Sequence, residues 1–430
     1  MKPILSLITF CMFSSTLFGQ ALYFPPNFSF EWETVTTSDL GWCDDELEEM
    51  TDFHENTNTK AFIILKNGRM ALEMYFDDHE VTTPWYWASA GKTMTAALIG
   101  IAQEDGWIDI NSPTSAYLGE GWTSCTPAQE SEIKVRHQLT MTTGLDFVTL
   151  NQNCTDPDCL EYRSAPDEEW YYYNAPYTLL TRVLTNVSGQ SYTDYTNEKL
   201  AHKIGFVGFW SEANSNHIFY STARGMARFG LLMLNNGDWG SEVILKDKAY
   251  LHNSVNPSQP INESYGYLWW LNGKNSYKLP STTFTFDGAM FPEAPDDLYA
   301  AIGKNGQICI VVPSQNLVIV RMGENPDDSS VPLEYVRELW STYAKLDCSS
   351  TVHESIVHDV VVWPRLTSEY LHFSGSVDFD RIDILDKSGR ILISVGNTDR
   401  LDVSRLANGI YFAHVISDGQ SITKRFFKVR

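Results

Sequence analysis

The chain is short of basic side chains, and this shortage limits the partners it can have. Lysine and arginine total 31 against 54 aspartates and glutamates, a formal net charge of −23, and no Lys/Arg cluster occurs. Proteins bind nucleic acids through basic patches that contact the phosphates. The composition therefore argues against a nucleic-acid partner.

Long apolar runs are missing after the N-terminus. No stretch beyond residue 19 has the length and apolar purity of a transmembrane helix, so we expect no spanning membrane segment. The chain begins with Lys2, the apolar run 4–10 and then small residues, a pattern typical of a cleaved secretory signal. We therefore predict a signal peptide over residues 1–19 and an exported mature protein.

The usual motifs for metals and nucleotides are absent as well. The 10 histidines are scattered, no H-E-x-x-H or paired-cysteine spacing occurs, and no glycine-rich phosphate loop follows a predicted strand. We therefore predict no metal, no nucleotide and no other cofactor.

Cysteine is sparse, with seven in 430 residues. Export permits disulfides, and Cys154 and Cys159 flank a proline-containing turn that can bring two thiols within bonding range, so we predict that they pair. Cys43 and Cys348 flank the larger domain and are a second candidate pair. Cys309 lies in a strand-like run and is expected to be a buried free thiol. The complete scheme stays open, because six cysteines beyond the signal allow 15 full pairings.

The apolar pattern predicts an α+β domain over residues 20–348. Asn67 and Gly68 separate two apolar runs, as in a tight β-hairpin. Helical patterns fill the middle of the domain and strands return near its end, so we expect an antiparallel sheet assembled from both ends with helices packed on it. The predicted strands cover 61–65, 69–76, 298–302, 307–312 and 317–322, and the predicted helices cover 89–104, 134–141, 176–186, 192–203, 222–234 and 332–343.

Residues 349–430 have a different pattern of short alternating runs separated by turns, such as those at 386–389 and 418–419. This pattern is typical of a small all-β sandwich. The segment has no catalytic set of residues, so we predict that chemistry belongs to residues 20–348.

The stretch from Ser89 to Lys92 runs directly into a helical pattern. With Ser89 at the start of that helix, Lys92 lies one turn on and on the same face, so the amine and the hydroxyl can share a proton. The helix N-terminus adds N–H groups and a partial positive charge, which favour an oxyanion at the serine. The sequence thus predicts a nucleophile and its base. Ser421 and Lys424 have the same spacing, but in a strand-like run they would point to opposite faces.

Two shorter patterns could supply the other polar groups of a serine–lysine enzyme. In the run 170–174, Tyr172 can relay a proton and Asn174 can hold the lysine amine and the substrate. In the run 303–307, Lys304 and Gly306 would let a substrate lie along a strand edge beside a cation. Each pattern alone is usually structural, the first as core packing and the second as a turn.

Taken together, Ser-x-x-Lys at 89–92, Tyr-x-Asn at 172–174 and Lys-x-Gly at 304–306 resemble the serine β-lactamase and penicillin-binding-protein superfamily. The similarity is to its class C-like β-lactamases, family VIII esterases and 6-aminohexanoate-dimer hydrolase-like members. It covers about residues 35–345 and includes the flanking runs 87–92, 139–144 and 221–228. Asn305 departs from the family pattern, where a hydroxyl residue or glycine is usual, which weakens the case for a carboxylate-bearing β-lactam as natural substrate.

The resemblance implies a role for each site residue. Ser89 would be the acylated nucleophile, and Lys92 and Tyr172 would act as a shared base, also for deacylation, because no separate glutamate base can be assigned. One of the two must have its pKa lowered from about 10 toward neutrality. Burial would lower the pKa of Lys92, while nearby cations would favour a Tyr172 tyrosinate. The remaining roles are substrate positioning by Asn174, Lys304 and Gly306, and an oxyanion hole formed by the backbone N–H groups of Ser89 and Gln307.

The C-terminal segment resembles the sorting domain of the type IX (Por) secretion system. The resemblance is carried by the runs 384–390 and 406–412 and by the basic, apolar ending 424–428, although the usual Pro-Asn-Pro is here Trp-Pro-Arg at 363–365. It implies secretion machinery as a partner and delivery through the periplasm to the cell surface or medium. The alternative is an accessory domain for substrate or surface binding, and cleavage of the domain after export stays open.

The sequence thus predicts an exported serine hydrolase that acts on a small-molecule or peptide-like ester, amide or lactam. The competing interpretation is a binding protein or sensor on the same fold, without catalysis or with slow turnover. The motifs do not separate an esterase from a D-aminopeptidase, a linear-amide hydrolase or a β-lactamase, because cleft loops set the specificity. They also leave the oligomeric state open.

Overall fold

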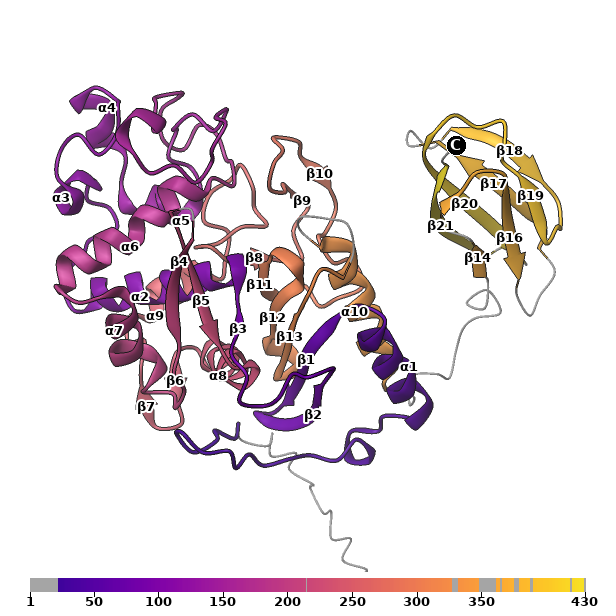
Figure 1. Ribbon diagram of the computed structural model, residues 1–430, viewed down its shortest axis with the longest axis horizontal. Coiled ribbons are helices and arrows are strands. Elements are labelled where there is room, and N and C mark those ends of the chain that lie inside the picture. Colours follow the sequence, from indigo (N-terminus) through magenta and orange to yellow (C-terminus); the bar gives the residue numbers. More distant parts are fainter. Residues whose placement is uncertain are drawn as a thin grey trace, which may run out of the picture. The chain divides into compact units, whose positions relative to one another are not determined.

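The computed structural model describes residues 22–213, 215–326, 332–347, 361–363, 366–374, 379–386, 390–417 and 420–428. The predicted signal peptide over residues 1–19 lies outside these ranges. The chain divides into two compact units, residues 1–348 and 349–430 (Figure 1). In the described ranges of both units, no helix has the length and apolar character needed to cross a membrane.

The first unit is built on a six-stranded antiparallel sheet with the order β2-β1-β13-β12-β11-β8. Asn67 and Gly68 have positive φ angles of 49° and 77° and close the predicted hairpin between β1 and β2. Strand β1 also pairs with β13 from the far end of the unit, so both ends build one sheet, as predicted. The strands are β1 (Thr59–Lys66), β2 (Arg69–Tyr75), β8 (Trp270–Leu271), β11 (Tyr299–Gly303), β12 (Gln307–Val312) and β13 (Leu317–Gly323).

Helices cover both faces of this sheet. On one face α8 packs closely, because a Cβ atom on Gly230 would lie only 2.6 Å from Cγ1 of Val318 and 2.8 Å from Sγ of Cys309. On the other face the guanidinium of Arg321 lies 5.1 Å from the ring centre of Tyr335 in α10, which packs on α1. All residues of β12 and β13 are consequently buried. The helices are α1 (Asp44–Glu55), α8 (Ala223–Leu234) and α10 (Leu333–Lys345).

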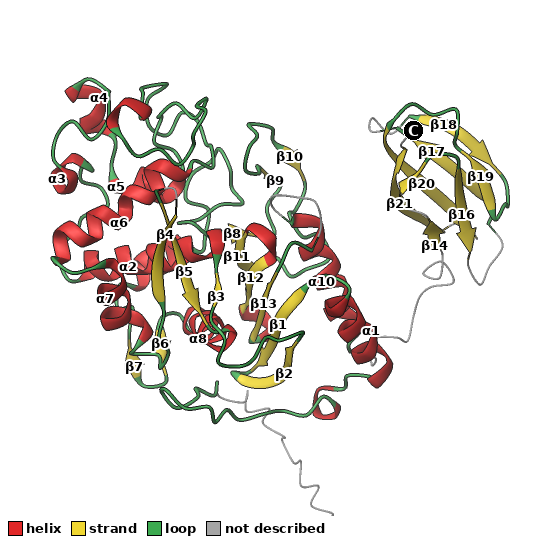
Figure 2. Ribbon diagram, viewed as in Figure 1, coloured by secondary structure: helices red, strands yellow, loops and turns green. Residues whose placement is uncertain are grey.

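The middle of the first unit is mainly helical, as Figure 2 shows. A small sheet with the order β3-β5-β4 lies within it. The predicted helix over 192–203 forms as α7 and a π-helical turn, η4. The helical elements are η2 (Ala88–Gly91), α2 (Lys92–Glu104), α3 (Ser115–Leu118), α4 (Pro127–Glu132), α5 (Val135–Thr140), η3 (Pro157–Cys159), α6 (Asn174–Ser188), α7 (Tyr192–Thr196), η4 (Asn197–Ala201) and α9 (Lys248–Ser254). The strands of the small sheet are β3 (Trp85–Tyr86), β4 (Phe209–Ala213) and β5 (Asn216–Ser221). Four short strands lie outside both sheets: β6 (Asp238–Trp239), β7 (Glu242–Val243), β9 (Ser276–Tyr277) and β10 (Phe286–Asp287). The remaining helical turns are η1 (Ser38–Leu40), η5 (Lys304–Gly306) and η6 (Pro313–Gln315).

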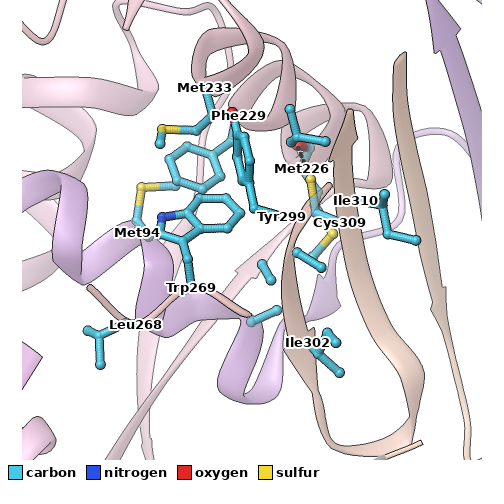
Figure 3. Close-up of a cluster of buried hydrophobic side chains, with 14 of the residues drawn as sticks. Met94, Met226, Phe229, Met233, Leu268, Trp269, Tyr299, Ile302, Cys309 and Ile310 are labelled. Carbon is cyan, nitrogen blue, oxygen red and sulfur yellow. Dashed lines mark hydrogen bonds between the residues drawn. The ribbon is translucent and has the colours of Figure 1, made fainter. Parts of the chain in front are cut away.

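A buried cluster joins helix α2 to the large sheet (Figure 3). Met94 of α2 and Phe229 of α8 belong to this cluster, and Trp269 stacks on the Phe229 ring at 6.0 Å between ring centres. Trp269 also packs edge-on against Tyr299 of β11 at 5.2 Å. Each such buried aromatic side chain stabilises the fold by about 2–3 kcal/mol. The cluster therefore holds α2 and β11 in a fixed relation, and these two elements frame the site described below.

The second unit is all-β in its described residues. It contains one sheet with the order β14-β16-β19 and one with the order β15-β21-β20-β17-β18. Side chains of both sheets share a hydrophobic core, which includes Leu371 and Phe373 of β16, Ile384 of β17 and Phe426 of β21. The predicted fold class is therefore confirmed for both units. The strands are β14 (Val361–Trp363), β15 (Leu366–Thr367), β16 (Tyr370–Ser374), β17 (Arg381–Leu385), β18 (Ile391–Val395), β19 (Arg400–Asp402), β20 (Gly409–Ser417) and β21 (Gln420–Lys428).

The cysteines follow the predictions where the structure describes them. Cys154 and Cys159 form a disulfide with their Cα atoms 6.0 Å apart. Cys43 is also disulfide-bonded, and its candidate partner Cys348 lies outside the described residues. Cys309 is a buried free thiol, as predicted.

Candidate active site

Ser89 lies in the tight turn η2, which runs directly into α2. The residue before it, Ala88, has a φ angle of +46°, a conformation that costs an L-residue about 1–2 kcal/mol. Neighbouring bonds hold this strained turn in place. The backbone N–H of Trp87 donates to the carbonyl of Phe219 at 2.8 Å, and its indole N–H donates to Oγ of Ser221 at 2.9 Å. Ser89 is thus presented by a rigid turn.

Lys92, the first residue of α2, points its amine at Ser89. The Nζ atom donates to Oγ of Ser89 at 3.2 Å. The rings of Tyr172 and Tyr177 flank the amine, with their centres 5.2 Å and 4.3 Å from Nζ. The side chain is only 5% exposed, and this burial lowers the pKa of the Lys92 amine to about 7. A large neutral fraction is therefore available at neutral pH, and a neutral amine beside a hydroxyl can accept its proton.

Tyr172 also lies close to Ser89. Its phenol interacts with the Ser89 side chain, and its ring stacks on Trp270 at 5.7 Å between ring centres. Burial raises the pKa of Tyr172 well above its ordinary value and outweighs the Ser89 hydrogen bond, which lowers it. The phenol therefore stays neutral near pH 7. This differs from the expectation of a tyrosinate, because the loss of hydration dominates.

Asn174 begins helix α6, two residues after Tyr172. Its Nδ2 donates to Oδ1 of Asn153 at 3.0 Å. Its own Oδ1 is buried and has no hydrogen-bond partner among the described residues. The Asn174 carboxamide is thus held by the segment around Asn153, a contact that the sequence did not predict.

The end of strand β11 lies against the Ser89 turn. A Cβ atom on Gly303 would lie 2.5 Å from the carbonyl oxygen of Trp87 and 3.0 Å from the backbone nitrogen of Ala90, so only glycine fits there. Gly303 was not among the predicted site residues. Lys304, the next residue, is exposed.

Gly306 and Gln307 contact strand β13. Gly306 has a φ of 73°, and a Cβ atom on it would lie 2.5 Å from Nη1 of Arg321. The side-chain amide of Gln307 donates to the carbonyl of Gly323 at 2.6 Å and accepts from its N–H at 3.1 Å. These contacts shape the turn that carries Lys304.

The strand register determines which backbone groups of β11 turn away from β12. The N–H of Asn272 donates to the carbonyl of Leu298 at 2.9 Å, so the even-numbered residues of β11 direct their backbone groups away from β12. Gly303 pairs with Gln307 across β11 and β12, so the backbone groups of these two residues face each other. By the same alternation the N–H of Lys304 turns away from β12.

The arrangement as a whole can support nucleophilic chemistry. It combines a hydroxyl, a buried amine of lowered pKa and a neutral phenol in contact with one another. In the described part of the chain, no group of three or more His, Cys, Asp or Glu side chains is placed to hold a metal ion.

Comparison with known proteins places both units in families. Residues 50–329 match the Beta-lactamase family model, and residues 361–429 match the model of the Secretion system C-terminal sorting domain. An uncharacterized protein of Alkalihalophilus pseudofirmus is 24% identical over 298 residues, which cover 61% of this chain and 82% of that protein.

Two solved structures show the same fold. One is provisionally described as a 6-aminohexanoate-dimer hydrolase of Bacillus anthracis, with a TM-score of 0.57 and 18% identity over 74% of this chain and 88% of that one. The other is provisionally described as a β-lactamase of Bacteroides dorei, with a TM-score of 0.55 and 16% identity over 71% of this chain and 99% of that one. At these identities the likeness concerns the fold alone.

Proposed function

Because the chain belongs to the Beta-lactamase family, we propose that it is a serine hydrolase that forms an acyl-enzyme on Ser89 and hydrolyses an ester, an amide or a lactam. The observation that carries this proposal is the buried Lys92 amine, 3.2 Å from Oγ of Ser89, with its pKa lowered to about 7. A lysine with that pKa is a competent base at neutral pH.

The proposed acylation begins with Lys92. Its neutral amine takes the proton of the Ser89 hydroxyl while Oγ attacks the substrate carbonyl carbon, which becomes tetrahedral. The resulting ammonium lies against the rings of Tyr172 and Tyr177, whose π faces attract a cation. As the tetrahedral centre collapses to the acyl-enzyme, the Tyr172 phenol passes its proton to the leaving group and takes one from the Lys92 ammonium, so both side chains end neutral. Water then attacks the ester carbon, with Lys92 and Tyr172 moving the protons in the reverse order.

The oxyanion would be bound by backbone N–H groups. Ser89 supplies one of them, at the turn that precedes α2. For the second we propose the N–H of Lys304 in place of that of Gln307. The close approach of Gly303 to the Ser89 turn and the orientation of Gln307 toward Gly303 support this choice. The exposed Lys304 side chain and the Asn174 carboxamide remain candidates for substrate positioning.

The pKa of Lys92 predicts the pH profile of the reaction. Below pH 7 the amine is protonated and cannot accept the Ser89 proton, so kcat/KM should fall about tenfold per pH unit. Above pH 8 it should be constant, because the Tyr172 phenol keeps its proton. The measurement is kcat/KM from pH 5 to pH 9. Tyr172→Phe should lower the plateau and keep the midpoint near 7, whereas a kcat/KM that still rises tenfold per pH unit up to pH 9 would contradict a Lys92 base with a pKa of about 7.

One experiment tests the proposed function directly. The mature protein is incubated with a fluorophosphonate probe and with a penicillin probe, and turnover of p-nitrophenyl esters, D-amino amides and nitrocefin is then followed. Covalent labelling with turnover supports a hydrolase and ranks the substrate classes. Labelling without turnover would favour the sensor interpretation, and no labelling would exclude an activated serine.

The C-terminal unit carries a secretion sorting domain, which indicates export to the cell surface or the extracellular space. We propose that the secretion machinery is its partner and that it contributes nothing to catalysis, since all candidate site residues lie in the first unit. Removal of residues 350–430 should leave kcat/KM within about threefold of the full chain. In the native host the shortened protein should accumulate in the periplasm.

Fractionation of cells that express each form, with an activity assay of every fraction, checks this prediction. Normal delivery of the shortened protein would contradict the sorting role. Normal delivery combined with lost activity on a polymeric substrate would identify the unit as a binding domain.

A further inference from the structure

A loop of the first unit contacts the segment that carries Tyr172. We call residues 151–159, which include the disulfide between Cys154 and Cys159, the disulfide loop. It contacts three of the four residues 171–174 and leaves Tyr172 to contact Ser89. The contacts are from Nε2 of Gln152 to the phenol oxygen of Tyr171 at 3.0 Å, from the phenol of Tyr173 to the carbonyl of Cys159 at 3.4 Å, from Nδ2 of Asn174 to Oδ1 of Asn153 at 3.0 Å, and from the N–H of Ala175 to the carbonyl of Gln152 at 2.9 Å.

Bonds within the loop hold Asn153 in place. Its N–H donates to Oδ1 of Asn151 at 3.0 Å, and the N–H of Cys154 donates to the carbonyl of Asn151 at 3.1 Å. The disulfide begins at the next residue and closes the loop on itself. Asn153 therefore meets Asn174 from a position that is already ordered.

The contact with Asn153 determines how the Asn174 carboxamide lies. A carboxamide can turn by about half a rotation and exchange its acceptor for its donor. The bond to Asn153 engages Nδ2, so the buried Oδ1 is left as the group without a hydrogen-bond partner among the described residues. Without that bond, both orientations would be populated, and the polar group that Asn174 presents, two residues after Tyr172, would no longer be defined.

We propose that Asn153 is a positioning residue for the reaction at Ser89, that it acts through Asn174, and that the disulfide holds it in place. The inference rests on the proposed function, since it assigns Asn153 to the same reaction. Asn153 accepts the hydrogen bond, so a carboxylate at this position can replace it and an aliphatic side chain cannot.

The test compares kcat/KM of five variants on a p-nitrophenyl ester that the protein hydrolyses. Asn153→Ala should lower it about 3- to 10-fold, the effect of one hydrogen bond. The kcat/KM of Asn153→Asp should stay within about twofold of the native value, because the hydrogen-bond acceptor is kept. In the Asn174→Ala background, Asn153→Ala should have no further effect. The exposed Asp158 of the same loop provides a matched control, and Asp158→Ala should leave kcat/KM unchanged.

Equal losses for Asn153→Ala and Asn153→Asp, or multiplied losses in the double variant, would overturn the inference. The pair Cys154→Ser and Cys159→Ser should reproduce the Asn153→Ala loss and not add to it, and unchanged activity would remove the disulfide from the proposal. These exchanges are preferred to a reductant, because Cys43 is disulfide-bonded as well. A native chain without turnover would reject the proposed function itself, whereas native turnover with insensitive Asn153 variants rejects only this inference.

Discussion

Replacing Ser89 by alanine is expected to abolish covalent labelling by a fluorophosphonate probe and to lower turnover by about 10⁴- to 10⁶-fold. The substitution removes the oxygen that would form the acyl bond. Backbone donors at the turn remain, so weak residual catalysis by water can persist. Ser89 is only partly buried, and alanine is its neighbour on both sides, so the fold should be retained.

The second Ser-x-x-Lys pattern provides the matched control for this experiment. Ser421 lies in β21 of the C-terminal unit, and Ser421→Ala should leave labelling and turnover unchanged. Circular dichroism and the thermal unfolding midpoint of both variants confirm that the fold is intact. Labelling that survives Ser89→Ala would show that another residue is the nucleophile.

Replacing Lys92 by methionine is expected to lower the acylation rate about 10³-fold. The methionine side chain is about as long as that of lysine but carries no basic group, so the Ser89 hydroxyl loses the group that accepts its proton. Single-turnover acylation by a p-nitrophenyl ester measures the effect. Combined with Tyr172→Phe the loss should be far less than the product of the two single losses, because both side chains serve one proton path. Independent losses would mean that the two residues act in separate steps.

The single variant Lys92→Met should be at least as stable as the native chain. The folded protein holds Lys92 with a pKa of about 7, while an unfolded lysine titrates near 10.5. Between these values the unfolded chain binds the extra proton, so the buried lysine destabilises the fold increasingly as the pH falls, and the penalty is constant below pH 7. The gain from Lys92→Met should be largest below pH 7. Denaturant unfolding at pH 6 and pH 9 tests this, with Lys424→Met as an exposed control. A lower stability of Lys92→Met at pH 6 would contradict the buried, uncompensated amine.

Features that depend on neighbouring residues could be predicted from the sequence. The Asn67-Gly68 hairpin, the start of α2 next to Ser89 and the strands that close the sheet follow from local turn geometry and from the period of apolar residues. The Cys154 disulfide follows from a short separation around a proline. The two units are also visible as a change of pattern, since helical and strand periods differ.

The state of the site residues depended on tertiary contacts. The sequence placed Lys92 one turn after Ser89, but only the burial of its amine in the folded domain lowers its pKa to about 7. The same loss of hydration raises the pKa of Tyr172, because burial always disfavours the charged form. Charge counting along the sequence had favoured a tyrosinate, since the depth of burial cannot be read from local spacing.

The sequence by itself determined the order of the elements and the division into two units, and it suggested the chemistry that we propose, because each of these depends on short-range patterns. Only the tertiary structure decided which residues meet: Gly303 reaches the Ser89 turn from more than two hundred residues away, and Asn153 bonds to Asn174 across the disulfide loop. Neither contact has a local signal, since a glycine at a strand end and an asparagine in a loop are common. Their roles arise from close approach of distant backbone and side-chain atoms, which is set by the packing of the whole domain.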